Sequence, residues 1–101
     1  MIVVITAAAE HDLESIADRI AQDSPTRALT FLAELRRRCA TLIDALEGYA
    51  LVPRYEVLGI RRRPYRDYLI FYRVAGEIIE ILHVLRGARD YEAILFPEER
   101  H

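Results

Sequence analysis

Residues 60–86 read IRRRPYRDYLIFYRVAGEIIEILHVLR, and this stretch decides the fold. It contains three runs rich in β-branched and aromatic residues, the types that favour strands. A glycine near the second link allows the positive φ of a tight turn. The three runs are Ile60 to Tyr65, Tyr68 to Val74 and, after Ala75 and Gly76, Ile78 to Arg86. The stretch therefore predicts a meander of antiparallel strands.

The first twenty residues predict one strand followed by one helix. Ile2 to Ile5 is a β-branched run of strand length, and Thr6 is a residue type that caps helices. Beyond it, apolar residues recur at helical spacing while mostly acidic side chains occupy the other faces. These apolar residues are Leu13, Ile16, Ala17 and Ile20. The strand therefore leads straight into an amphipathic helix that begins at Ala7.

A second helix is predicted directly after the first. Ser24 is a good cap, and Pro25 fits the first helical position, where no backbone N–H is needed. Apolar residues then recur from Ala28 to Leu46, which predicts about five turns ending near Gly48. The two helices form a hairpin whose apolar side can cover the meander. We therefore predict an α+β fold, with the N-terminal strand in a mostly antiparallel sheet packed against a helical hairpin.

The remaining segments carry weaker patterns. Tyr55 to Leu58 predicts a short extra strand, Asp90 to Phe96 predicts a short tail strand or turn, and Pro97 to His101 is expected to fray. The chain has 101 residues, with no linker composition and no internal repeat. We therefore expect one domain spanning residues 1–101.

The sequence carries no signal for export or membrane insertion. The N-terminal apolar run is short and no basic residue precedes it, and no run approaches the roughly 18 residues of a membrane span. Cys39 is the single cysteine, so an internal disulfide is impossible, and its apolar neighbours predict a core position. We expect a cytoplasmic protein.

Charge is distributed unevenly along the chain. All 14 basic residues are arginine, against 16 acidic residues, and the net charge is −2. A chain with this balance is a poor general binder of nucleic acid, so we expect no direct sequence-specific contact with DNA or RNA. Between residues 54 and 73, however, arginines outnumber acidic residues. We therefore expect an anionic surface to bind only at this arginine-rich segment.

The patterns of most catalytic sites are missing from the sequence. His11, His83 and His101 stand far apart without a spaced acidic cluster, so we expect no metal. Ser15 and Ser24 lie on or beside predicted helices, away from the sharp turn of a nucleophile elbow. The four glycines are isolated, which argues against a phosphate-binding loop or a nucleotide cofactor.

An arginine set on the meander is the best candidate site. Because side chains alternate along a strand, Arg61 and Arg63 share one face, and Arg62 takes the other. If the hairpin covers one face only, the other exposes a concave patch of arginine and tyrosine, residue types that anchor interfaces. The partner-binding candidates are Arg61, Arg63, Arg73, Arg86 and Arg89. Arg61 to Arg66 can alternatively be a solvated edge that discourages aggregation, and His83 a satisfied sheet histidine.

The order of these features resembles the RelE/ParE superfamily of toxins from type II toxin–antitoxin systems. Its N-terminal pattern Thr-x-x-Ala-x-x-Asp-Leu-x-x-Ile is matched by Thr6, Ala9, Asp12, Leu13 and Ile16. The three meander segments are similar to its arginine-bearing, central and closing strands. Where ParE-like members often read Arg-Val-Leu-His-Gly-Ala-Arg-Asp, residues 83–90 read HVLRGARD, so His83 and Arg86 have exchanged places.

The resemblance implies one of two activities. ParE-like members inhibit DNA gyrase by protein contact, whereas RelE-like members cut mRNA in the ribosome. The acidic balance, the absence of lysine and the long second helix favour the ParE branch, and hence binding rather than catalysis. The alternative is a ribosome-dependent mRNA endonuclease, whose phosphate site would consist of Arg73, Arg86, Arg89 and Tyr91.

The ParE branch also implies partners. We expect a ParD-like antitoxin that is acidic where it contacts the toxin, and DNA gyrase as the target. The antitoxin is expected to be dimeric and to carry two toxins, which makes a 2:2 or larger hetero-oligomer. No membrane partner is expected, and no homodimer surface is evident in the sequence.

Overall fold

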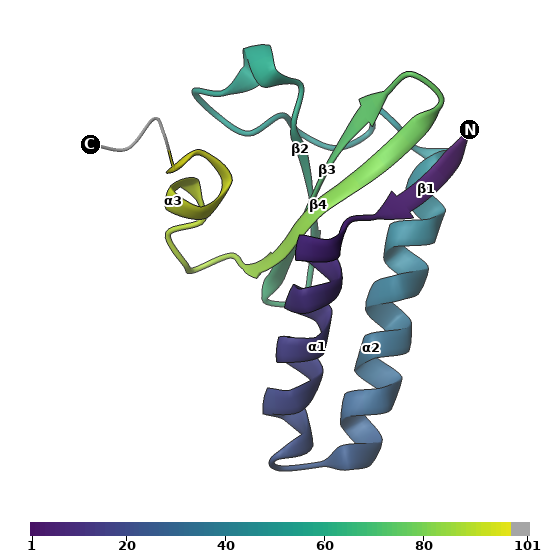
Figure 1. Ribbon diagram of the computed structural model, residues 1–101, viewed down its shortest axis with the longest axis vertical. Helices are drawn as coiled ribbons and strands as arrows, with labels where there is room; N and C mark the ends of the chain where they lie inside the picture. The colour runs from purple at the N-terminus through teal and green to yellow at the C-terminus, as the bar shows by residue number, and fades with distance from the viewer. Residues whose placement is uncertain (98–101) are drawn as a thin grey trace.

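The computed structural model describes residues 1–97 and has the predicted α+β fold (Figure 1). The strands lie in the order β1-β4-β3-β2, with β1 parallel to β4 and the other pairs antiparallel. Two 3-10 helices, η1 (Thr41–Asp44) and η2 (Glu56–Leu58), lie in the connection before β2. The strands and α-helices are β1 (Ile2–Ile5), α1 (Ala7–Ala21), α2 (Pro25–Ala40), β2 (Arg61–Tyr65), β3 (Tyr68–Ala75), β4 (Ile78–Arg86) and α3 (Glu92–Leu95).

Both helices of the hairpin begin at the predicted caps. The Thr6 hydroxyl accepts a hydrogen bond from the Ala9 N–H at 3.2 Å, and the Ser24 hydroxyl accepts one from the Arg27 N–H at 3.1 Å. The Thr6 hydroxyl also donates to the Ile81 carbonyl at 2.7 Å. This cap therefore satisfies one free N–H of α1 and ties the start of the helix to β4.

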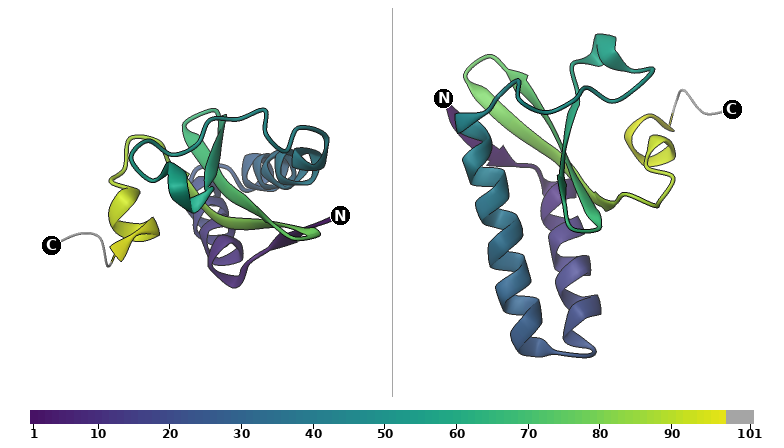
Figure 2. Two further views of the ribbon diagram at one scale, coloured as in Figure 1. Left: turned by 90° about the horizontal axis from the view of Figure 1, so that it is seen from above. Right: turned by 180° about the vertical axis from the view of Figure 1, so that it is seen from behind.

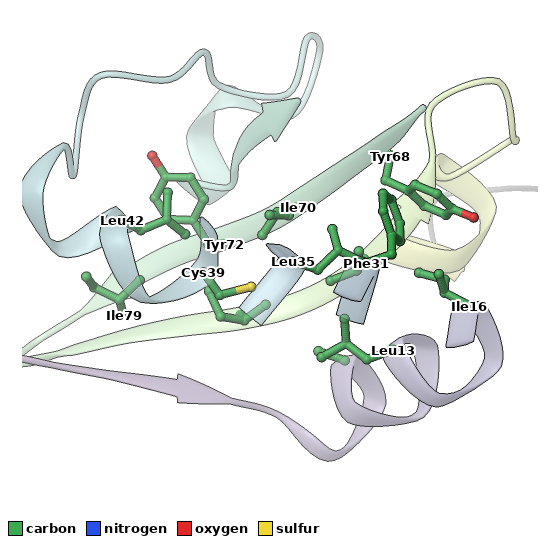
Figure 3. Close-up of a cluster of buried hydrophobic side chains, with 13 residues drawn as sticks. Leu13, Ile16, Phe31, Leu35, Cys39, Leu42, Tyr68, Ile70, Tyr72 and Ile79 are labelled. Carbon is green, nitrogen blue, oxygen red and sulfur yellow. The ribbon is translucent and has the colours of Figure 1, made fainter. Parts of the chain in front are cut away.

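The main core lies between the helical hairpin and one face of the sheet (Figure 3). Leu13 and Ile16 of α1 meet Leu35 and Cys39 of α2, and the aromatic ring of Tyr72 packs from the sheet. Cys39 is fully buried, as predicted, and burial raises the pKa of its thiol to about 11. Side chains alternate along β3 as in a regular strand, and Tyr68, Ile70 and Tyr72 all belong to this core.

A second, smaller core covers part of the opposite face of the sheet. Phe71 and Leu85 project from β3 and β4 against Val52, Ile60 and Phe96. The connection before β2 and the end of the chain supply the covering residues (Figure 2). The condition for the predicted patch of arginine and tyrosine, that only one face of the sheet is covered, therefore does not hold, because the large apolar side chains on the other face have their own cover.

The second helix is shorter than predicted. It ends at Ala40, and the 3-10 helix η1 follows, although Leu42 is fully buried and Leu46 still packs on the core. Apolar spacing reports which side chains are buried rather than which hydrogen bonds the backbone makes, so the pattern outlasts the α-helix. The length of this helix therefore gives less support to the ParE branch than the sequence suggested.

Two other weak predictions are also corrected. Tyr55 to Leu58 is not a strand: η2 forms there and ends at Gly59, whose φ is +72°. The tail contains one helical turn, α3, where a short strand or turn was predicted. Residues 98–101 of the segment predicted to fray lie outside the described part of the chain.

A β-bulge alters the predicted alternation in β4. Phe71 pairs with His83, but the next residue, Tyr72, pairs with Ile81, so the β4 strand contains one extra residue at Leu82. Val84 consequently joins Ile81 in the main core, although the simple alternation predicts that they lie on opposite faces. No helix within residues 1–97 combines the length and apolar character that a membrane crossing requires.

Candidate functional site

Two of the five candidate arginines bind the chain's own backbone. The Arg61 guanidinium donates to the Tyr49 carbonyl at 2.8 Å. The Arg63 guanidinium donates to the Arg38 carbonyl at 2.7 Å and to the Thr41 hydroxyl at 2.8 Å. The carbonyls at the end of α2 carry partial negative charge and lack helical partners, so a guanidinium is well suited to this position. Arg61 and Arg63 therefore hold the end of α2 and the following connection against β2.

Arg73 lies in a different part of the molecule. Its guanidinium pairs with Glu80 across β3 and β4 at 2.9 Å, near the turn that joins these strands. Arg86 is at the opposite end of β4, where it pairs in the sheet with Tyr68. The Tyr91 hydroxyl accepts a hydrogen bond from Arg62 at 2.8 Å. The phosphate site of the alternative requires Arg73 beside Arg86 and Arg89, and the structure does not bring these residues together.

Arg86 and Arg89 do come together, in an open groove of about 680 Å³ between α1 and the end of β4. We call it the arginine groove. Its polar lining is His11, Asp12, Ser15, Arg19, Tyr68, Arg86 and Arg89. Within residues 1–97, no carboxylate lies within ion-pair distance of Arg86 or Arg89. The groove therefore presents two guanidinium groups that form no ion pair within that part of the chain, while the carboxylates of Asp12 and Asp67 lie in the lining of the groove and of the hollows beside it.

Asp12 forms the clamp that holds the wall of the groove in place. One of its carboxylate oxygens lies 2.8 Å from Nδ1 of His83 and accepts a hydrogen bond from the Val84 N–H at 2.9 Å. On the other side, the Arg19 guanidinium donates to the Tyr68 hydroxyl at 2.6 Å. These contacts join α1 to β4 and β3, so His83 has the structural role of a satisfied sheet histidine.

The α1 residues of the groove were not predicted from the sequence. Arg19 and Ser15 lie on the polar side of an amphipathic helix, a position that is usually plain solvent surface. The sequence signals in this region are the matches of Asp12 and Ile16 to the superfamily pattern. The proximity of Arg19 and Ser15 to Arg86 depends on the angle at which α1 crosses β4, which the sequence pattern does not specify.

The groove has both cationic and apolar walls. Ile16, Val84 and Leu85 line it beside the arginines, and two adjoining hollows extend it along Arg66 and Arg86. A ligand that fits such a surface carries carboxylates or other anions together with apolar side chains. Among residues 1–97, no group of three or more His, Cys, Asp or Glu side chains is placed to hold a metal ion.

The helical hairpin on a four-stranded sheet is the fold that the resemblance to the RelE/ParE superfamily implies. A family model described as "ParE toxin of type II toxin-antitoxin system, parDE" matches residues 3–91. The chain therefore belongs to the ParE toxin family.

Comparison with solved structures gives a similar protein. A chain described as "Chromosomal ParDE TA system from P. aeruginosa" has 27% sequence identity and a TM-score of 0.73. The match covers 85% of this chain and 95% of that one. A search of curated proteins finds no match.

Proposed function

We propose that this protein is a cytoplasmic toxin that inhibits DNA gyrase by direct binding and is neutralised by a ParD-like antitoxin. The match to the ParE family over residues 3–91 carries this proposal. The similar structure from a ParDE toxin–antitoxin system supports an antitoxin of the ParD kind.

The arginine groove is the surface that we assign to the antitoxin. Arg86 and Arg89 have no carboxylate partner within residues 1–97, so an acidic segment gains charge-assisted hydrogen bonds there. The apolar wall formed by Ile16 and Leu85 accommodates an amphipathic segment. This assignment keeps Arg86 and Arg89 of the predicted arginine set as antitoxin contacts. Arg61 and Arg63 instead stabilise the fold.

Binding is favoured over RNA cleavage by the contacts of the candidate catalytic groups. An endonuclease requires an acid, a base and a charge stabiliser that converge on one phosphate. Here Arg73 is paired with Glu80, and Tyr91 contacts Arg62. Both groups are separated from the arginine groove, so the set named for RNA cleavage is divided among three places.

Gyrase supercoiling and cleavage assays test the target. The purified protein is expected to inhibit supercoiling or to increase double-strand cleavage of plasmid DNA by gyrase. Ribosome-dependent cutting of mRNA, together with no effect on gyrase, would overturn the proposed target in favour of the endonuclease.

The antitoxin surface is tested with the double variant Arg86→Ala/Arg89→Ala and titration calorimetry. The titrant is the purified product of the adjacent antitoxin reading frame. Loss of two charge-assisted contacts is expected to weaken binding by at least tenfold and to reduce its dependence on salt. Arg54→Ala is the matched control, because Arg54 is an exposed arginine that pairs with Glu92 and lines neither the groove nor the two adjoining hollows. Equal binding by the double variant and the control would refute this assignment.

A further inference from the structure

The strand β1 forms one margin of the sheet, and no other strand within residues 1–97 pairs with its outer edge (Figures 1 and 2). The Ile2 N–H donates to the Glu77 carbonyl at 3.0 Å, and the Thr6 N–H donates to the Ile81 carbonyl at 3.2 Å. In a parallel pair, alternate residues direct their backbone groups toward the partner strand. The N–H and C=O groups of Val3 and Ile5 therefore point outward, and within residues 1–97 no hydrogen bond reaches them.

This edge lacks the features that usually prevent strand addition. Natural edge strands carry charged side chains, proline or a bulge, and β1 has none of these. The exposed side chains of this strand are also apolar: Ile2 is 62% exposed and Val4 is 37% exposed. Ile78, the partner of Ile2 in the sheet, is exposed beside them, and Ile43 is exposed on η1, which packs near β1. Apolar surface thus flanks the edge.

The surroundings of this patch are electrically balanced. Val4 pairs in the sheet with Glu80, whose carboxylate is already paired with Arg73 at 2.9 Å. The Met1 ammonium beside Ile2 is likewise paired with the Glu77 carboxylate, at 3.9 Å. A charged partner therefore finds only charges that already have a partner at the patch, in contrast to the arginine groove at the other end of β4. A neutral, apolar strand suits the edge, and β1 of a second copy is such a strand.

We propose that two copies of this chain associate through β1 to form one continuous sheet of eight strands. The two β1 strands run antiparallel about a two-fold axis that passes between the two Val4 residues. In this register Val3 of each copy exchanges two backbone hydrogen bonds with Ile5 of the other, so that all outward-facing groups of both residues are satisfied. Val4 faces Val4 of the second copy in the central, non-hydrogen-bonded pair.

The interface is small, and the association is accordingly weak. A contact of two four-residue strands belongs to the class of interfaces that bury less than about 1,200 Å². The proportion of dimer therefore rises with protein concentration, without an antitoxin being present. The arrangement does not rest on the proposed function.

Disulfide trapping tests the register. The Cα atoms of a non-hydrogen-bonded antiparallel pair lie about 4.5 Å apart, which a disulfide can span. Val4→Cys is therefore expected to form a cross-linked dimer under mild oxidation, and the fully buried Cys39 does not compete. Ile2→Cys is the matched control: Ile2 is more exposed but faces Thr6 of the second copy, so its cross-linking is at least tenfold slower. Cross-linking of Ile2→Cys at an equal or greater rate would overturn the proposed register.

Light scattering of the unmodified protein tests the association itself. Its mass is expected to rise from 11.7 kDa toward twice that value as concentration increases. Val4→Lys places two ammonium groups at the axis and is expected to stay monomeric, whereas Val57→Lys, at an exposed site on η2, dimerises normally. A mass of 11.7 kDa at all concentrations would refute the dimer. Weaker antitoxin binding by Val4→Lys would then assign the edge to a strand of the antitoxin.

Discussion

Replacing Asp12 with alanine is expected to be among the most destabilising single changes on the surface of α1. Asp12 accepts hydrogen bonds from Nδ1 of His83 and from the Val84 N–H, at 2.8 and 2.9 Å. Bonds to a charged acceptor are each worth about 1.5–3 kcal/mol, and Val84 is buried, so its N–H loses its partner. Alanine recovers up to about 0.7 kcal/mol of helix propensity. The free energy of unfolding should therefore fall by about 2–5 kcal/mol.

Thermal and urea unfolding, followed by circular dichroism, measure this effect. For a domain of this size, the expected change lowers Tm by roughly 10–40 °C. Asp18→Ala is the matched control, because Asp18 is an exposed aspartate on the same helix and gains the same propensity. It should change stability by less than about 0.5 kcal/mol. If the two variants unfold within about 0.5 kcal/mol of each other, Asp12 is not the clamp between α1 and β4.

Three further predictions concern the hairpin. Leu35→Ala should lower stability by about 2–5 kcal/mol because Leu35 is fully buried, whereas Leu29→Ala on the same helix, at a side chain that is 72% exposed, should be nearly neutral by urea unfolding. Burial raises the pKa of Cys39 from 9.0 to about 11, so the thiol of the folded protein should resist alkylation at pH 8 until the protein unfolds. The stability linked to this thiol is complete below pH 9 and is lost as pH rises toward 11. The hydrogen bond from Arg36 lowers the pKa of Glu10 below 4.5, so this pair stabilises the fold above that pH, and its contribution is lost as pH falls through the lowered pKa. The difference in Tm between the unmodified protein and Arg36→Ala should therefore shrink in acid. A difference that stays constant with pH would contradict this.

Local chemistry accounts for most of the correct predictions of the fold. The caps at Thr6 and Ser24 act within one turn of backbone, so their effect is readable from adjacent residues. The three strands of the meander follow from β-branched and aromatic composition and short links, and the apolar spacing of α1 identifies its buried side. The family match rests on the same order of features along the chain.

The composition of the site depends on contacts between residues that are far apart in the chain. The sequence places Arg61, Arg63, Arg73 and Arg86 on the correct strands and Arg89 just beyond the last one, but it does not specify what each side chain contacts. Glu80 engages Arg73 across the short hairpin of β3 and β4, but the end of α2 engages Arg63 through contacts between residues 25 and 22 positions apart in the chain. Only packing decides such pairs.

Sequence alone thus determined the strand, the helical hairpin and the antiparallel meander, together with the toxin family to which they belong, because these follow from short-range propensity and from the order of elements. Tertiary structure alone decided that Arg86 and Arg89 share a groove with Arg19, that a second core covers part of the outer face, and that the edge of β1 is open. The physical reason is that one extra residue at Leu82 and the crossing of α1 over β4 determine where side chains meet, and neither leaves a periodic trace in the sequence.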